Sequence, residues 1–435
     1  MVIGRIINSK RKIIRRLCLI NSPNLHKSQY WTYSKLLNFQ NDRLRRIIAY
    51  SYYNIPAYKR KFDSVGIVPD DIKSIEDLKK LPITTREEMQ DNMSFVNSKL
   101  ITATHTTGGS TGTSLKYYNS FISDAIRSGV HNRGWKWFGY NPGKRLAIVM
   151  SSQGVIGGKN TILLSGDLSE GNLELNTQKL LEFQPEFLRG YVSSLYIMAR
   201  YFLDRDIKLD SVKAINTISE NLYEYQREII EMAFRGKVFE EYCCNDGGAC
   251  AWECEEHDAL HYSMERAIIE EIDGEMIVTD LWNKAMPFIR YRNGDAVTFL
   301  DKKCSCGRNL PLIKVRGRSN DIIITPTGVV GPTYLMVKGI NYSGKEYFRS
   351  GIKAVQYVQK PGYNMEIFVV RNPWCTTQEL AAFQDDLKKI LVGMNLFIRF
   401  VDDIPSTIRG KRSFVINEDK ELLKRYHQPS NSEKN

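Results

Sequence analysis

A run of glycine and hydroxyl residues at 106–114 has the composition of a phosphate-binding loop and reads Thr-Thr-Gly-Gly-Ser-Thr-Gly-Thr-Ser. Its three glycines permit positive φ angles and a close approach of the backbone to a ligand. The interleaved hydroxyl groups add donors beside exposed backbone amides, which suits a phosphate chain. The run is not a Walker loop, because a Gly-Lys-Ser/Thr ending is absent. Flexible linkers share this composition, so the run alone leaves phosphate binding and a linker equally open.

Cysteine and histidine side chains offer a second kind of chemistry, metal binding. The chain has eight cysteines, which in a long chain without an export signal are expected to be thiols or metal ligands. A closed, structural Cys₃His site for Zn²⁺ is predicted from Cys254, His261, Cys304 and Cys306. His257 is a competing ligand, and unligated thiols with one surface histidine are the alternative. The remaining cysteines of this region are interpreted as small packing residues rather than ligands: Cys243, Cys244 and Cys250.

Alternating strand-like and helical segments between 144 and 290 must position these side chains. An apolar run at 145–150 is bounded by polar residues, and a second run at 212–218 precedes a helical pattern at 221–234. A further strand candidate follows at 237–242. This alternation predicts an α/β fold with mixed, mostly parallel sheets.

Beyond Arg316 the pattern of predicted elements changes. A helix is predicted at 377–391, and short strand candidates surround it at 322–324, 355–358, 367–370 and 398–401. This pattern predicts a small α+β domain. The chain has 435 residues, too many for one typical core. We therefore expect a large N-terminal domain at 1–317 and a small C-terminal domain at 318–435.

The charge balance restricts the partners of the chain. Lys and Arg number 61 against 49 Asp and Glu, which gives a net charge of +12. Without a recognition helix or an RNA-binding signature, nucleic acid is not expected. The N-terminal segment 1–35 interleaves basic and apolar residues, so it is either an amphipathic helix on an anionic membrane or a solvated terminal helix. Its apolar runs are too short to span a membrane and no signal-peptide pattern is present, so a cytoplasmic location is expected.

Three further motifs follow the glycine-rich run in a fixed order. They are Tyr-Arg-Asn-Gly-Asp at 291–295, Gly-Arg-Ser-Asn-Asp at 317–321 and Pro-Ser-Thr-Ile-Arg-Gly-Lys-Arg at 405–412. Each motif alone is a turn or a solvated loop, but the ordered set resembles the acyl-adenylate-forming superfamily. More narrowly, residues 40–420 are similar to the phenylacetate–CoA ligase branch and its capsular-polysaccharide CapK-type relatives. Segments 54–58, 81–83 and 304–308 fit the same branch.

The resemblance implies a set of ATP-binding residues. The phosphate loop would hold the β- and γ-phosphates through Thr107, Gly108, Gly109, Ser110, Thr111, Gly112 and Thr113. The adenine would lie beside Ser219, Glu220 and Asn221 and stack on Tyr242. Asp295 would accept the ribose hydroxyl groups, and Arg318 would reach the ribose or a phosphate. Related proteins also carry a Cys/His arrangement similar to the predicted zinc site.

The resemblance also implies a C-terminal domain that moves. Asn320 falls at the hinge, and Lys411 is the mobile lysine that approaches the substrate carboxylate and the α-phosphate. One motif departs from the family: Tyr-Gly-x-Thr-Glu is replaced by Tyr-Cys-Cys-Asn-Asp at 242–246. Asp246 can still serve as a carboxylate for Mg²⁺, although its side chain is one methylene shorter than that of glutamate.

The implied reaction explains these residue types. A carboxylate attacks the α-phosphorus of ATP and pyrophosphate leaves, so two anions must be positioned and neutralised. The flexible ammonium group of Lys411 supplies a compact charge. The carboxylate of Asp295 can accept two charge-assisted hydrogen bonds from vicinal hydroxyl groups.

Three functions follow from the resemblance. The leading hypothesis is an AMP-forming ligase that activates a carboxylic acid and transfers the acyl group to CoA. A variant transfers the acyl group to an amine or hydroxyl acceptor on a sugar. A catalytically silent nucleotide-binding scaffold is the third. The acid is not identified, because the aromatic candidates for its pocket, Trp135, Trp137, Phe138 and Tyr140, are of a type more often found in cores.

Overall fold

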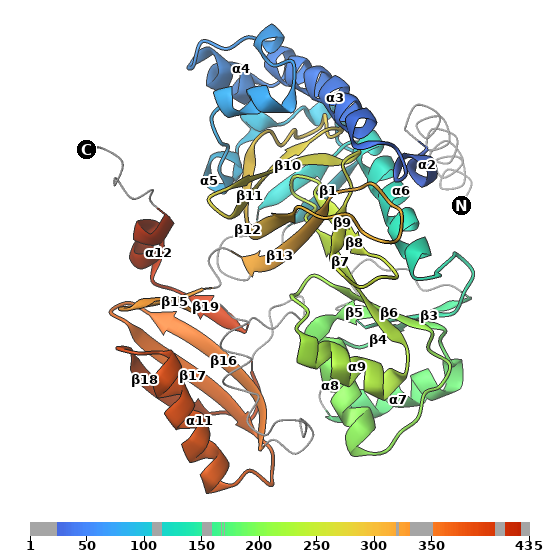
Figure 1. Cartoon of the computed structure of the whole chain (residues 1–435), viewed down its shortest axis with the longest axis vertical. Coiled ribbons are helices and arrows are strands. Elements are labelled where there is room, and N and C mark those ends of the chain that lie inside the picture. The colour runs from blue at the N-terminus through green and yellow to red at the C-terminus, as the bar shows by residue number, and fades with distance from the viewer. Residues whose placement is uncertain are drawn as a thin grey trace.

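The fold is taken from a computed structural model, which describes residues 24–106, 115–149, 159–166, 168, 170–318, 322–330, 351–404 and 414–427. Its largest element is an eleven-stranded sheet in the order β10-β11-β12-β13-β9-β8-β7-β6-β5-β3-β4. A separate four-stranded sheet, β18-β17-β16-β19, follows in the C-terminal part (Figure 1). The predicted α/β fold with a mixed sheet is thereby confirmed.

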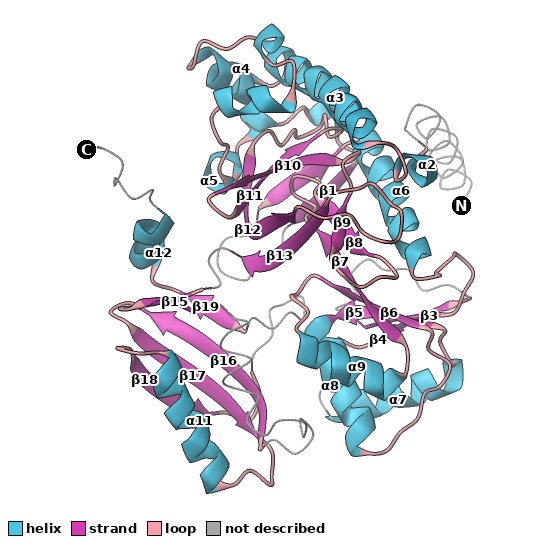
Figure 2. Cartoon of the chain, in the orientation of Figure 1, coloured by secondary structure: helices cyan, strands magenta, loops and turns pink. Residues whose placement is uncertain are grey.

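One half of the large sheet is parallel and is built from alternating strands and helices. Its strands are β3 (Leu146–Val149), β4 (Thr161–Leu164), β5 (Phe187–Tyr191), β6 (Ala214–Ile218) and β7 (Lys237–Cys243). The helices between them are α7 (Glu170–Phe183), α8 (Val192–Asp204) and α9 (Glu224–Phe234), which gather beside these strands (Figure 2). Buried residues of both, such as Leu188, Phe202 and Ile229, form one apolar cluster. The strand–helix alternation predicted for this region therefore holds.

The other half of the sheet is antiparallel, so the parallel share is smaller than predicted. Its strands are β8 (Cys250–Glu253), β9 (Leu260–Tyr262), β10 (Ala267–Ile272), β11 (Glu275–Asp280), β12 (Tyr291–Leu300) and β13 (Leu312–Arg318). The connections are short; β10 and β11 are joined by Asp273 and Gly274, both with positive φ. Such turns suit a hairpin, whereas a parallel crossover needs a dozen or more residues.

N-terminal helices cover part of the antiparallel half. They are α2 (Leu25–Ser28), α3 (Tyr33–Asn54), α4 (Pro56–Asp63), α5 (Arg86–Met89) and α6 (Phe121–Trp137), with the β1 (Ala103–Thr106) and β2 (Lys116–Asn119) hairpin before α6. Pro56 stands at the first turn of α4, where its missing N–H costs nothing. The buried ion pair between Arg133 of α6 and Glu265, at 2.7 Å, fixes α6 to the sheet. Among the described residues, we find no helix with the length and apolarity needed to cross a membrane.

Gly134 lets α6 lie directly against the sheet. A Cβ atom at this position would stand 2.4 Å from Cγ of Trp252, which is fully buried in β8. Gly134→Ala is therefore expected to lower the free energy of unfolding by about 1–3 kcal/mol, because an overpacked core must shift. Gly171→Ala in α7 is the matched control, since nothing lies within 4 Å of its added Cβ, and it should gain up to about 1 kcal/mol. Equal stability of the two variants in urea unfolding would contradict this packing.

The C-terminal part has its own sheet and core. Its elements are β14 (Ile323–Thr325), β15 (Gly328–Val330), β16 (Ile352–Lys360), β17 (Asn364–Arg371), α11 (Thr377–Ile390), β18 (Asn395–Phe400), β19 (Val415–Asn417) and α12 (Lys420–His427). Tyr357, Ile367 and Phe383 are buried together between this sheet and α11. A capping box between Thr376 and Glu379 begins α11 at the residue that the sequence predicts. The predicted strands and helix of this part are all present.

Candidate active site

The parallel strands β5, β6 and β7 end at the same edge of the large sheet. Ile218 at the end of β6 pairs with Glu241 near the end of β7. The two segments that follow, 219–221 and 242–246, therefore lie at one edge of the sheet. The carboxyl edge of parallel strands is where α/β proteins bind their ligands. This topology brings together two of the segments that the sequence assigns to the nucleotide.

The loop after β6 is held in an unusual conformation. Ser219 has φ of 65°, in the left-handed region that side chains other than glycine rarely adopt. Glu220 accepts hydrogen bonds from the backbone N–H and the hydroxyl group of Ser193, at 2.7 and 3.0 Å, at the start of α8. The carboxylate of Glu220 thus ties this loop to α8, a role that the sequence did not indicate. Strained residues of this kind concentrate at functional sites.

Tyr242, Asn293 and Asp295 form a compact polar cluster between β7 and β12. The Tyr242 hydroxyl group donates to Oδ2 of Asp295 at 2.5 Å. The Asn293 amide donates to the Tyr242 hydroxyl group at 3.0 Å and to the same carboxylate at 3.2 Å. Burial and the nearby charge of Asp295 raise the pKa of Tyr242 well above its usual range, so this phenol stays a donor. The carboxylate of Asp295 is therefore held in place beside the end of β7.

The turn after β7 places Asp246 near the same cluster. Tyr291 donates to Oδ2 of Asp246 at 3.3 Å. The next two residues need to be glycine: Gly247 and Gly248 have φ of 110° and 79°, and a Cβ on Gly247 would meet Val278 at 2.2 Å. Burial, and then the charge of Asp246, raise the pKa of Tyr291. Asp246 itself stays partly exposed.

Several predicted site residues lie outside the described residues. These are the phosphate-loop residues from 107 to 113, the hinge residue Asn320 and Lys411. The described strands β1 and β2 border the phosphate loop, and Thr106 pairs with Lys116 across them. Arg318 is the backbone partner of Asp295 in the β12–β13 ladder, which places the two residues side by side. Nothing is described for the Arg318 side chain.

The four residues predicted to bind zinc lie together at the other end of β8 and β9. Their ligand atoms are all within 4.8 Å of one another: Cys254, His261, Cys304 and Cys306. The Sγ atoms of Cys254 and Cys304 are 3.6 Å apart, and Nε2 of His261 is 3.3 Å from Sγ of Cys306. Nδ1 of His261 lies 3.1 Å from the carbonyl oxygen of Leu310. Burial is the main cause that lowers the pKa of His261, which keeps the ring neutral.

His257, the competing ligand, is not part of this cluster. Its ring packs on Phe239, with centroids 4.5 Å apart, and its Nδ1 is 3.5 Å from Glu253.

The aromatic residues considered for an acyl pocket make other contacts in the structure. Trp137 packs edge-on against His261, and Phe138 and Tyr140 belong to a buried cluster with Phe187. Trp137 and Tyr140 are therefore core residues, and Phe138 packs against the core while partly exposed.

The sequence missed some members of the site. Asn293 lies two residues before Asp295 within a motif that the sequence had identified, so its amide could have been named. His131, Arg189 and Glu241 are joined by contacts between α6, β5 and β7. Local sequence has no signal for that second group, because its members come from three elements far apart in the chain.

The fold defines the class of protein. The structure of a 2-hydroxyisobutyryl-CoA ligase in the postadenylation state, in complex with R3-HIB-AMP, superposes with a TM-score of 0.73 and covers 92% of this chain and 93% of the ligase. Sequence identity over that match is 16%, so this likeness establishes the fold alone. The chain therefore has the fold of this acyl-CoA ligase.

Sequence comparison finds similar proteins of two kinds. No protein-family model matches the chain. Protein CapK of Staphylococcus aureus is 26% identical over 412 residues, which cover 88% of this chain and 89% of CapK. The phenylacetate-coenzyme A ligase of Thermus thermophilus is 25% identical over 330 residues, which cover 69% of this chain and 74% of the ligase. The chain is thus a relative of the phenylacetate–CoA ligases and CapK, which confirms the resemblance found in its motifs.

Proposed function

We propose that this protein is an ATP-dependent, AMP-forming acid–thiol ligase. It activates a carboxylic acid as an acyl-adenylate and then transfers the acyl group to CoA. The observation that carries the proposal is the Tyr242–Asn293–Asp295 cluster. It lies at the edge of the sheet where the parallel strands end, in a chain with the fold of acyl-CoA ligases.

The proposed nucleotide site uses residues from both halves of the sheet. Asp295 accepts the ribose hydroxyl groups, and Tyr242 presents its ring to the adenine beside the loop at 219–221. Asp246 would provide the carboxylate for Mg²⁺, and the ion would offset the negative charge of the phosphates. Arg318 reaches the ribose or a phosphate, as its backbone position next to Asp295 favours. The loop at 107–113 holds the β- and γ-phosphates.

Asp295→Ala is expected to lower acyl-adenylate formation about 100-fold or more, because two charge-assisted hydrogen bonds to the ribose are lost. Tyr242→Phe keeps the ring but removes the hydroxyl group that orients Asp295, so its effect should be about tenfold. Asp301→Ala is the matched control, since Asp301 is an exposed aspartate just beyond the same strand. Carboxylate-dependent ATP–pyrophosphate exchange measures all three. Exchange by the Asp295 variant at the rate of the Asp301 variant would remove Asp295 from the site.

Zn²⁺ is proposed at the cluster of Cys254, His261, Cys304 and Cys306. Three thiols and one imidazole are the donor set of a closed, structural zinc site. The contact of His261 Nδ1 with the Leu310 carbonyl fits an N–H donor at Nδ1, which directs Nε2 towards the metal. The site is buried between β8–β9 and the loop before β13, so the ion would join two segments of the sheet.

The C-terminal part, 318–435, is proposed to act as a lid. Its separate sheet and core support a domain boundary just after Arg318, where β13 of the large sheet ends and before β14 begins at Ile323. Rotation at Asn320 would bring Lys411 to the nucleotide for the first step and withdraw it for the second. The ammonium group of Lys411 would supply the positive charge that the reaction needs at the α-phosphate.

A second candidate acceptor is an amine or hydroxyl group of a sugar. It is favoured by the longer match to CapK, which covers 88% of this chain against 69% for the Thermus thermophilus ligase.

Contact with an anionic membrane through the basic segment 1–35 is also proposed. Within the described end of that segment, Leu25 and Ser28 are buried, whereas Lys27, Tyr30 and Lys35 are exposed and could take part in the contact.

ATP–pyrophosphate exchange over a panel of aromatic, aliphatic and amino acids tests the first step. AMP release with CoA, compared with amino sugars, then tests the acceptor. At least one acid should support exchange, and CoA should speed the release of AMP. Nucleotide binding without exchange for any acid would instead indicate a silent scaffold.

A further inference from the structure

A second group of metal-binding side chains lies apart from the Cys254 cluster. His131 from α6 meets Cys243 at the end of β7 and Cys250 at the start of β8. Nε2 of His131 is 3.6 Å from Sγ of Cys243, which is 2.8 Å from Sγ of Cys250. All three ligand atoms lie within 4.8 Å of one another. From the sequence alone, Cys243 and Cys250 are interpreted as packing residues.

Strand pairing brings the two thiols together. Cys243 and Cys250 are direct partners in the β7–β8 ladder. The backbone N–H of Cys244 donates to the carbonyl oxygen of Ala249. Cys243 and Cys250 therefore form a non-hydrogen-bonded pair of the antiparallel ladder. Side chains approach most closely at such positions. The neighbouring Cys244 differs, because its thiol contacts the carbonyl oxygen of Asp246 at 2.8 Å.

The histidine of this group is held by a carboxylate. Nδ1 of His131 is 3.3 Å from Oε1 of Glu241, whose side chain is buried. Arg189 binds both oxygens of Glu241, at 2.6 and 3.0 Å, and the indole of Trp135 donates to Oε2 at 3.1 Å. A carboxylate at Nδ1 leaves Nε2 for a metal ion, the usual arrangement at zinc-bound histidines. Here Nε2 is directed at the two thiols.

We propose that His131, Cys243 and Cys250 form a second metal site, which binds a thiophilic divalent ion such as Zn²⁺. Two thiolates and one imidazole are suitable zinc ligands, and three protein ligands leave the fourth tetrahedral position open. With sulfur–zinc distances of about 2.3 Å, two sulfurs lie about 3.8 Å apart. The thiols must therefore separate by about 1 Å from their present positions, which side-chain rotation can provide.

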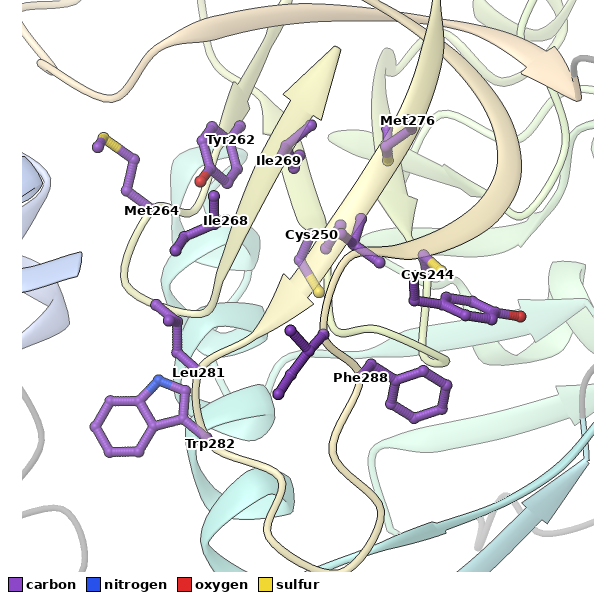
Figure 3. Packing of buried hydrophobic residues seen from close by; sticks show 14 of the residues in the cluster. Cys244, Cys250, Tyr262, Met264, Ile268, Ile269, Met276, Leu281, Trp282 and Phe288 are labelled. Atoms are coloured by element: carbon purple, nitrogen blue, oxygen red, sulfur yellow. The ribbon is translucent and has the colours of Figure 1, made fainter. Parts of the chain in front are cut away.

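The surroundings of the group favour a metal over simple packing. Cys250 is buried in the main apolar cluster, which also contains Cys244 (Figure 3), yet His131 and Glu241 bring a titratable ring and a charge to its edge. A cross-strand disulfide would use both thiols and leave the oriented Nε2 without a ligand. Cys243 also follows Tyr242, so the ion would lie one residue from the proposed adenine contact. Its open position would be available to a donor atom of a small molecule.

The metal content of the reduced, full-length protein tests the proposal. The wild type is incubated with Zn²⁺ and a phosphine reductant, freed of unbound metal, and its zinc is counted per chain. The double variant Cys243→Ser, Cys250→Ser should hold about one zinc less per chain than the wild type. Cys244→Ser is the matched control and should hold as much as the wild type. This difference does not depend on adenylation or on zinc at the Cys254 cluster.

A Co²⁺ titration of the wild type provides a measurement that needs no cysteine variant. His131→Gln keeps both thiols and should weaken binding at this site at least tenfold, with sulfur-to-cobalt absorption reduced at equal Co²⁺. Equal zinc content in the double variant, the Cys244 control and the wild type would overturn the proposal. So would a Cys243–Cys250 disulfide in a protein that takes up no additional zinc after reduction. If the double variant does not fold, the effect of His131→Gln on the Co²⁺ titration decides the question.

Discussion

Lys411→Ala is expected to lower acyl-adenylate formation by a factor of about 10²–10³ or more. The attack of a carboxylate on the α-phosphate brings two anions together, and a positioned cation stabilises that charge in the transition state. An ammonium group on a flexible stem can enter and leave with the lid. ATP–pyrophosphate exchange with an accepted acid measures this first half-reaction.

The second half-reaction should respond differently to the same substitution. Thioester formation from a preformed acyl-adenylate and CoA should stay within a few-fold of the wild type, because no new bond to phosphorus is made. Lys420→Ala is the matched control, since Lys420 is an exposed lysine at the start of α12. A Lys411→Ala protein that exchanges as fast as the Lys420 variant would refute the assigned mechanism.

Loss of the proposed structural zinc should have the second largest effect. Cys304→Ser removes one of the four proposed ligands, which lie on β8–β9 and on the loop before β13. Binding energies of about 10–16 kcal/mol in zinc-finger peptides show that such an ion stabilises the fold directly. We therefore expect the variant to lose zinc and its free energy of unfolding to fall by several kcal/mol. Metal analysis and urea unfolding measure the two effects.

Cys375→Ser provides the comparison for that substitution. Cys375 is a partly exposed free cysteine just before α11, outside both cysteine–histidine groups. It should keep the zinc content and the unfolding midpoint of the wild type. Chelation of the wild-type protein should lower its free energy of unfolding at least as much as Cys304→Ser does. Equal zinc content in the Cys304 and Cys375 variants would rule out metal at this cluster.

The sequence by itself determined the class of fold and most of the local elements. Strand–helix alternation predicted three of the five parallel strands, at 145–150, 212–218 and 237–242, whereas β4 and β5 were not named from the sequence. Ordered motifs gave the branch, because motifs such as Tyr-Arg-Asn-Gly-Asp keep the chemistry of a ligand contact in a few adjacent residues. The set Cys254, His261, Cys304 and Cys306 was also named correctly as a group that comes together.

Only the tertiary structure decided which distant side chains meet. The antiparallel half of the sheet places Asn293 and Asp295 beside Tyr242, and no periodicity in the sequence states which strands become neighbours. The same strand pairing brings Cys243 and Cys250 together beside His131. Local propensity acts over a few residues. The contact between Tyr242 and Asn293 spans 51 positions and that between His131 and Cys243 spans 112, and both depend on hydrophobic packing that has no direction of its own.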